Sequence, residues 1–125
     1  MKLRLRGNSL RLRLTRNEVT RLAESGLVEE SVSFGTSADS VLVYRIRSGE
    51  LQDATHAAGQ IEVLVSASSV RDWAAGPTEG IYFETASQLR VAVEKDFRCL
   101  APREGEDDSD AYEHPGGTST CSVSV

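Results

Sequence analysis

Five cationic side chains in the first thirteen residues have the type and spacing to bind an anion. They alternate with leucine on both sides of Gly7-Asn8 and are Lys2, Arg4, Arg6, Arg11 and Arg13. A two-residue turn at Gly7-Asn8 predicts a hairpin, and because side chains alternate between the faces of a strand, the five cations share one face and the leucines the other. Four of the five are arginine, which can bind phosphate through two parallel hydrogen bonds. We expect this ribbon to contact an anionic partner.

The partner stays open at this point. The alternative is that the five cations bind no partner and form the solvated side of a half-buried ribbon, because arginine stems also cover apolar surface. The ribbon has no aromatic side chain for base stacking, which argues against single-stranded nucleic acid, whereas duplex DNA contacted through its backbone remains a candidate. A third candidate is the chain's own acidic run, Glu104–Glu113, which contains six acids and no base.

Charge is distributed unevenly along the 125 residues, whose net charge is −5. Residues 1–21 contain seven of the fourteen basic residues and one acid, so the remaining chain is strongly acidic. The segment 101–125 combines the acidic run with proline, glycine, serine and threonine, a composition that predicts a disordered tail. Folded over the ribbon, this tail would act as an autoinhibitory mimic of an anionic ligand.

Signals for catalysis and metal binding are few. The chain has no G-x-S-x-G motif, no phosphate-binding glycine loop and no cysteine with a local histidine partner, so no catalytic residue is predicted. Glu94, Asp96 and Arg98 alternate at a predicted strand end, where we expect a salt-bridged terminus; the alternative is a ligand-binding or enzymatic site. Cys99, His114 and Cys121 lack the spacing of a zinc site. We predict no metal and no cofactor.

Hydrophobic periodicity and caps outline the elements. Thr15-Arg-Asn-Glu18 has the pattern of a capping box, and the helix it starts should end at Gly26. Strands are expected over 27–34, 41–46, 51–57, 61–65, 81–83 and 89–93, and a second short helix is expected after the serines of 66–69.

The two halves resemble each other at a shift of 51 residues. Leu10, Leu12 and Leu14 then fall on Ile61, Val63 and Val65, and Thr15 falls on Ser66. Each half would be a ββαββ unit with too little core of its own, so pairing is expected to close a common barrel. The predicted fold is α+β, mainly antiparallel strands with two short helices in a pseudo-two-fold barrel. The globular domain should span 1–100, with pseudo-repeats of about 1–50 and 51–100.

Two resemblances follow from these residues. Leu12–Val19, continuing through Leu22 and Gly26, resembles AbrB-type transition-state regulators and antitoxins, which implies a swapped-hairpin barrel and DNA binding by the basic N-terminal ribbon. The second half has Asp53, His56, Gln60 and Glu62 where the first has cations, so a two-fold DNA-binding surface is not preserved. Met1–Thr15 with Glu18-Val19, and Val93–Leu100 with the acidic tail, are similar to a family of small uncharacterised bacterial proteins of no established activity.

Composition completes the expectation. The hydrophobic fraction of 39% and charged fraction of 26% are those of a globular protein. No stretch approaches the roughly 18–20 apolar residues of a membrane span. No signal peptide is recognised, and two cysteines make a poor disulfide framework, so a cytoplasmic location is expected.

The leading hypothesis is a non-enzymatic bacterial binding or regulatory module that contacts an anionic partner through its basic ribbon. A small enzyme or ligand-binding barrel, and a protein-interaction scaffold, are the alternatives.

Overall fold

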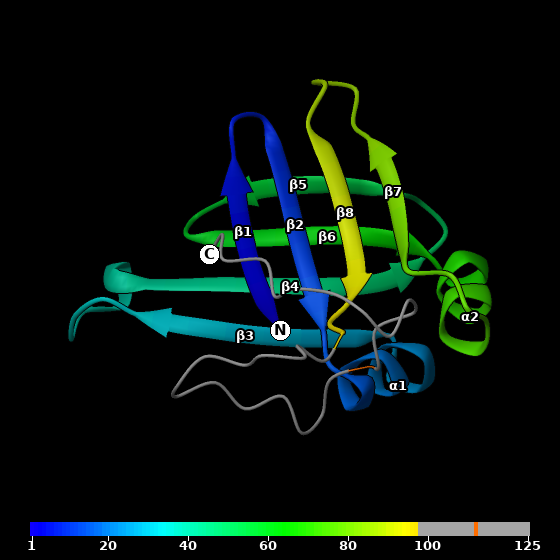
Figure 1. Ribbon diagram of the computed structural model, residues 1–125. Helices are drawn as coiled ribbons and strands as arrows, with labels where there is room; N and C mark the ends of the chain where they lie inside the picture. Colours follow the sequence, from blue (N-terminus) through cyan, green and yellow to red (C-terminus); the bar gives the residue numbers. More distant parts are fainter. Residues whose placement is uncertain (98–111, 113–125) are drawn as a thin grey trace.

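The computed structural model describes residues 1–97 and Tyr112 as two four-stranded sheets and two helices (Figure 1). Along the chain the elements are β1 (Lys2–Arg6), β2 (Ser9–Leu14), α1 (Arg16–Ser25), β3 (Leu27–Ser33), a 3-10 turn η1 (Ala38–Ser40), β4 (Val41–Gly49), β5 (Asp53–Ala57), β6 (Gln60–Ser66), α2 (Ala67–Ala75), β7 (Gly80–Glu84) and β8 (Arg90–Lys95). The fold is α+β, as expected, and most strand pairs are antiparallel. The acidic run Glu104–Glu113 and the predicted disordered tail lie outside the described residues, apart from Tyr112.

Each sheet is assembled from both halves of the chain. The first has the order β1-β2-β8-β7 and the second β3-β4-β6-β5. The outer pairs are antiparallel hairpins, whereas the central pairs β2–β8 and β4–β6 are parallel. Parallel pairing at the centre was not predicted. Parallel strands need a crossover connection. Between β2 and β8 this is most of the chain, whereas between β4 and β6 it is the short segment 50–59 that contains β5.

The predicted closed barrel is wrong. The strands of the two sheets run crosswise, one sheet in front of the other (Figure 1). Strands that cross cannot share a hydrogen-bonded ladder, so in the described part of the chain β1, β7, β3 and β5 remain sheet edges. Lys2, Arg4 and Arg6 place charge on the edge strand β1, a common means of preventing edge-to-edge aggregation.

The first hairpin has the predicted register. Lys2 pairs with Arg13, Leu3 with Leu12, Arg4 with Arg11, Leu5 with Leu10 and Arg6 with Ser9. The turn is Gly7-Asn8, where Gly7 has φ +54°, a conformation that favours glycine. A slip of one residue would expose the leucines and bury the cations, so the buried face determines this register strongly.

Local capping determines where the helices begin and end. The Thr15 hydroxyl accepts the Glu18 backbone N–H, the Glu18 carboxylate accepts the Thr15 N–H at 2.9 Å, and Gly26 ends α1 in the left-handed conformation. The predicted capping box and the predicted helix end at Gly26 are both confirmed. The Ser66 hydroxyl caps α2 by accepting the Ser69 N–H. The two helices lie together at one corner of the crossed sheets (Figure 1).

The core lies between the sheets and beneath the helices. Leu12, Leu14, Leu22, Ile46, Val63, Val65 and Val93 are each fully buried, and Trp73 is 1% exposed. Trp73 satisfies its indole N–H by donating to the Glu79 carbonyl at 3.0 Å. Within the described residues, no helix combines the length and apolar character needed to cross a bilayer.

Candidate functional site

Three transverse registers place the predicted cations on the outer face of the first sheet. Following the strand pairing across β1, β2, β8 and β7, the registers read Arg6–Ser9–Arg90–Glu84, Arg4–Arg11–Ala92–Tyr82 and Lys2–Arg13–Glu94–Gly80. The alternate residues of β2 and β8 are buried in the core, so these twelve point away from it. We call this surface the basic face; its cations are Lys2, Arg4, Arg6, Arg11, Arg13 and Arg90.

Three of the predicted cations have acidic partners within the sheet. Arg11 Nε lies 3.2 Å and Arg13 Nε 3.7 Å from Glu94 Oε1, and Lys2 Nζ lies 3.1 Å from Asp96 Oδ2. Among residues 1–97 and 112, Arg4, Arg6 and Arg90 form no ion pair within 4.0 Å. The basic face therefore has three cations neutralised in part and three available to an external anion.

Arg90 and Tyr82 were not predicted as members of this site. The alternation of β8 does place Arg90 on the face opposite to buried Val91 and Val93, so a signal for its orientation was present. Which strand lies beside β8 was not evident, because the β2–β8 pairing links residues about eighty positions apart. The ribbon itself has no aromatic side chain, but β7 brings Tyr82 onto the same face.

Tyr82 is held in one position on the basic face. Its hydroxyl donates to Glu94 Oε2 at 2.8 Å, while 55% of the residue remains exposed. Partial burial, the hydrogen bond to Glu94 and the charge of Glu94 together raise the pKa of Tyr82 to about 12. Gly80 makes room for the phenol, because a Cβ on Gly80 would lie 2.8 Å from the Tyr82 hydroxyl and 2.8 Å from the Val93 carbonyl.

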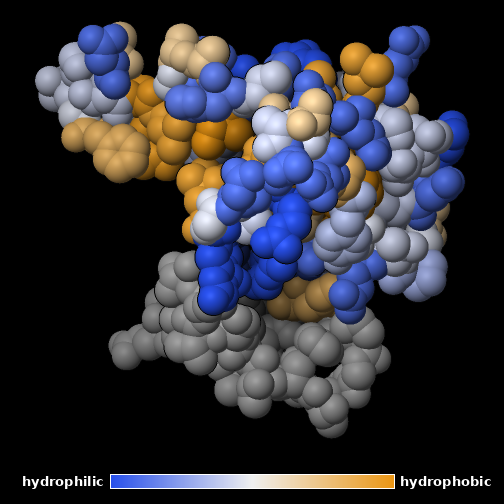
Figure 2. Space-filling view, turned by 90° about the horizontal axis from the view of Figure 1, so that it is seen from above, coloured by the Kyte–Doolittle hydropathy of each residue, from blue (hydrophilic) through white to orange (hydrophobic). Residues whose placement is uncertain are grey.

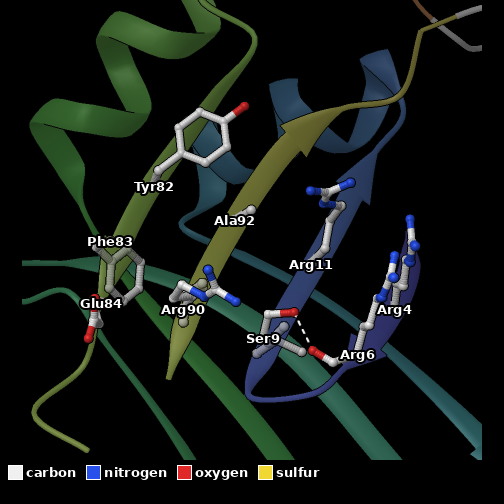
Figure 3. A pocket seen from close by; sticks show the side chains of 11 residues that line it. Arg4, Arg6, Ser9, Arg11, Tyr82, Phe83, Glu84, Arg90 and Ala92 are labelled. Carbon is white, nitrogen blue, oxygen red and sulfur yellow. Dashed lines mark hydrogen bonds between the residues drawn. The ribbon is translucent and has the colours of Figure 1, made fainter. Parts of the chain in front are cut away.

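A shallow hollow of about 680 Å³ lies on the basic face. Arg4, Arg6 and Arg11 stand on one side, Tyr82 stands on the other, and the small side chain of Ala92 lies between them (Figure 3). Arg90 projects at the end nearest the hairpin turn. The hollow thus offers guanidinium groups and the ring of Tyr82, with one carboxylate, Glu84, at its β7 side.

The outer face of the second sheet has a different charge pattern. Its cations Arg45 and Arg47 both pair with carboxylates: Arg45 Nε lies 2.6 Å from Glu29 Oε2, and Arg47 Nε lies 3.4 Å from Glu62 Oε2. Asp53 stands on the same face by register. Figure 2, a view from above, shows strongly hydrophilic side chains in the middle of the molecule and also along its upper and right edges, so the difference between the sheets lies in charge pairing rather than in hydropathy. The unpaired positive charge is a property of one sheet only.

The sequence offered an alternative site at Glu94, Asp96 and Arg98, and the structure shows the first two of these residues in ion pairs. Glu94 and Asp96 hold Arg11, Arg13 and Lys2, as expected for a salt-bridged strand end, and Arg98 lies outside the described residues. Cys99, His114 and Cys121 also lie outside them. Within residues 1–97 and 112, no cluster of three or more His, Cys, Asp or Glu could hold a metal ion.

A second polar cluster surrounds the α-amino group of Met1. This ammonium pairs with Glu18 at 2.6 Å and with Glu30, and the Tyr44 hydroxyl donates to Glu30 at 3.2 Å. Burial lowers the pKa of the Met1 ammonium, but the carboxylates of Glu18 and Glu30 outweigh this effect and raise it above its ordinary value of 8.0. The cluster joins the start of β1 to α1 and the second sheet, which is a structural role.

Tyr112 packs where β8 ends. Its backbone N–H donates to the Asp96 carbonyl at 2.7 Å, and its ring meets Phe97 edge to face with 5.9 Å between centroids. Arg16 and Lys95 each place a cationic group 5.3 Å from the Tyr112 ring centroid. The contact brings residues 97 and 112 together beside the Lys2 end of the basic face.

Comparisons with known proteins give a family and no activity. Residues 1–116 match the model described as a family of unknown function (DUF7009). No curated protein and no solved structure matches the chain.

Proposed function

We propose that this chain, which belongs to the family of unknown function matching residues 1–116, is a small non-enzymatic binding module whose basic face contacts an anionic partner. The observation that carries the proposal is the presence of Arg4, Arg6 and Arg90 on one flat surface without an ion pair among the described residues. The basic face has six cations against the two carboxylates Glu84 and Glu94. Like charges repel one another, so an anion bound among Arg4, Arg6 and Arg90 would be stabilised.

A comparison of the two halves supports this proposal. We infer that they are pseudo-repeats: the β5–β6 hairpin has the register of β1–β2 shifted by 51 residues at all five pairs, and its turn falls at Ala58-Gly59. The order β1-β2-α1-β3-β4 corresponds to β5-β6-α2-β7-β8, and each half contributes one hairpin to each sheet.

The cations have no counterparts in the second half. At the shift of 51, the positions of Lys2, Arg4, Arg6, Arg11 and Arg13 are occupied by Asp53, Thr55, Ala57, Glu62 and Leu64. Four of the five leucine positions, in contrast, correspond to Ala54, Ile61, Val63 and Val65, which pack in or against the core. His56 falls on Leu5 and Gln60 on Ser9, so of the residues first compared with the cations only Asp53 and Glu62 occupy cation positions. Since the second hairpin has the same register without these cations, the architecture does not require them, and a binding role accounts for their presence.

The test is salt-dependent binding of a labelled polyanion to the full chain. Replacing Arg4, Arg6 and Arg90 together by Ala should weaken binding and reduce the slope of log K against log salt by about 2 to 3, because each neutralised phosphate adds about 0.7–0.9 to that slope. The matched control removes three exposed arginines elsewhere, Arg21, Arg47 and Arg71. If both triple variants bind equally weakly, net charge alone explains the effect and the basic face is not the binding site. If wild type binds no polyanion at low salt, the proposal is wrong.

A further inference from the structure

The ring of Tyr82 is an exposed aromatic surface fixed among cations. In Figure 3 its ring is seen broadside in a view onto the basic face, with Arg11 across Ala92 from it. The hydrogen bond to Glu94 holds the ring there, and the absence of a side chain at Gly80 leaves room for it. An aromatic ring in this position can stack on any nucleobase, because every base has a π-face.

The shape of the basic face disfavours the groove of a duplex. Four strands spaced about 4.8 Å apart span about 14 Å between the outer backbones, before side chains are added. The major groove is about 12 Å wide and admits a helix or a two-stranded ribbon. The β1–β2 hairpin is not a free ribbon, because β8 pairs along the whole of β2. A broad, open sheet surface instead suits unstacked bases laid across it.

We infer that the basic face binds single-stranded nucleic acid, with one base stacked on Tyr82 and the adjoining phosphates on Arg4, Arg11 and Arg90. The inference rests on the proposed function and adds the class of partner. The hollow of about 680 Å³ falls within the range of about 300–1,000 Å³ that is typical of small-ligand sites, so it accommodates a nucleotide unit. Alternate residues of a strand lie about 7 Å apart, so the cations of neighbouring registers form a positive track on which successive phosphates can lie.

The experiment measures fluorescence anisotropy of labelled probes with the full chain at low and high salt. The main probe is an oligothymidylate about a dozen nucleotides long, within the site sizes of single-strand binding proteins. An abasic strand of the same length carries the same phosphates without bases. A duplex of that length and a polyglutamate peptide represent the competing partners. Wild type is compared with Tyr82→Ala, Tyr82→Phe and, as a control on the other sheet, Arg47→Ala.

Loss of the ring should weaken oligothymidylate binding by about 5- to 150-fold, the equivalent of one stacked base. The same change should leave abasic-strand binding unaltered, and Tyr82→Phe should recover the oligothymidylate affinity. Circular dichroism and thermal unfolding establish that each variant is folded. If Tyr82→Ala is not, the test rests on whether wild type binds oligothymidylate more tightly than the abasic strand.

The outcomes separate the two proposals. If the abasic strand binds as tightly as oligothymidylate and Tyr82→Ala changes neither, the single-strand inference is wrong while the anion-binding proposal stands. Tighter binding of the duplex or of polyglutamate also overturns the inference, in favour of that partner. If no probe binds wild type at low salt, both proposals fail.

Discussion

The exchange Glu94→Gln should strengthen polyanion binding, the opposite of what removal of a structural ion pair usually does. The Glu94 carboxylate contacts Arg11 and Arg13 and accepts the Tyr82 hydroxyl, so it is the principal negative charge within the basic face. Glutamine keeps the size of the side chain and an accepting oxygen, but it releases both guanidinium groups to an external ligand.

The magnitude follows from Coulomb's law and from counterion release. A phosphate bound about 6 Å from the Glu94 carboxylate is opposed by about 0.7 kcal/mol in water, which is about threefold in affinity, and by more where the face is desolvated. One or two additional phosphate contacts would steepen the salt slope by about 0.7 to 1.4 for a single strand. Fluorescence anisotropy across a salt series measures both quantities.

Glu62→Gln is the matched control. Glu62 also holds two arginines, Arg45 at 3.6 Å and Arg47 at 3.4 Å, but on the outer face of the second sheet. The pKa of Tyr82 reports independently on the exchange: without the Glu94 charge it should fall from about 12 towards 10 in a spectrophotometric titration. A folded Glu94→Gln variant with this lower Tyr82 pKa, yet with unchanged or weaker polyanion binding, would refute the reasoning, because Arg11 and Arg13 would then be free of Glu94 without adding to the binding.

Three further predictions concern stability. The folded chain should lose stability as the pH rises from 8 through the raised pKa of the Met1 ammonium, because the folded state holds a proton that the unfolded state releases in this range. In urea unfolding at neutral and alkaline pH, Glu30→Gln should reduce this loss of stability. An equal loss in wild type and variant would contradict the role given to Glu30. Gly80→Ala should lower the free energy of unfolding by about 1–3 kcal/mol, because the added Cβ would lie 2.8 Å from the backbone carbonyl of Val93. An unchanged thermal midpoint would show that the strands adjust without strain. Leu12→Ala should cost about 2–5 kcal/mol in the same assay, whereas Leu5→Ala, on the same face of the hairpin but 63% exposed, should cost far less.

Local sequence signals predicted the parts of the fold that depend on neighbours in the chain. The two-residue turn at Gly7-Asn8 and the alternation beside it determine the first hairpin register, and Thr15, Glu18 and Gly26 determine both ends of α1. Each of these features involves groups only a few residues apart. Their energies are local, and pattern reasoning could find them.

The candidate site was predicted in part for the same reason. Alternation alone places Lys2, Arg4, Arg6, Arg11 and Arg13 on one face. It also places Arg90, Ala92 and Glu94 on one face of their own strand, but it does not say that this strand lies beside the ribbon. The ribbon itself has no aromatic side chain, and alternation along it could not show that the ring of Tyr82 reaches the same face from β7, two strands away from β2.

The sequence by itself determined the hairpins, the helix caps and the shared face of the five N-terminal cations, through turn chemistry, side-chain alternation and capping hydrogen bonds. Only the tertiary structure decided that the hairpins of the two halves join in crossed sheets rather than a barrel, and that Arg90, Glu94 and Tyr82 complete the basic face. The physical reason is that a strand's side-chain pattern specifies which of its faces is buried, whereas the choice of its neighbouring strand depends on how the whole core packs.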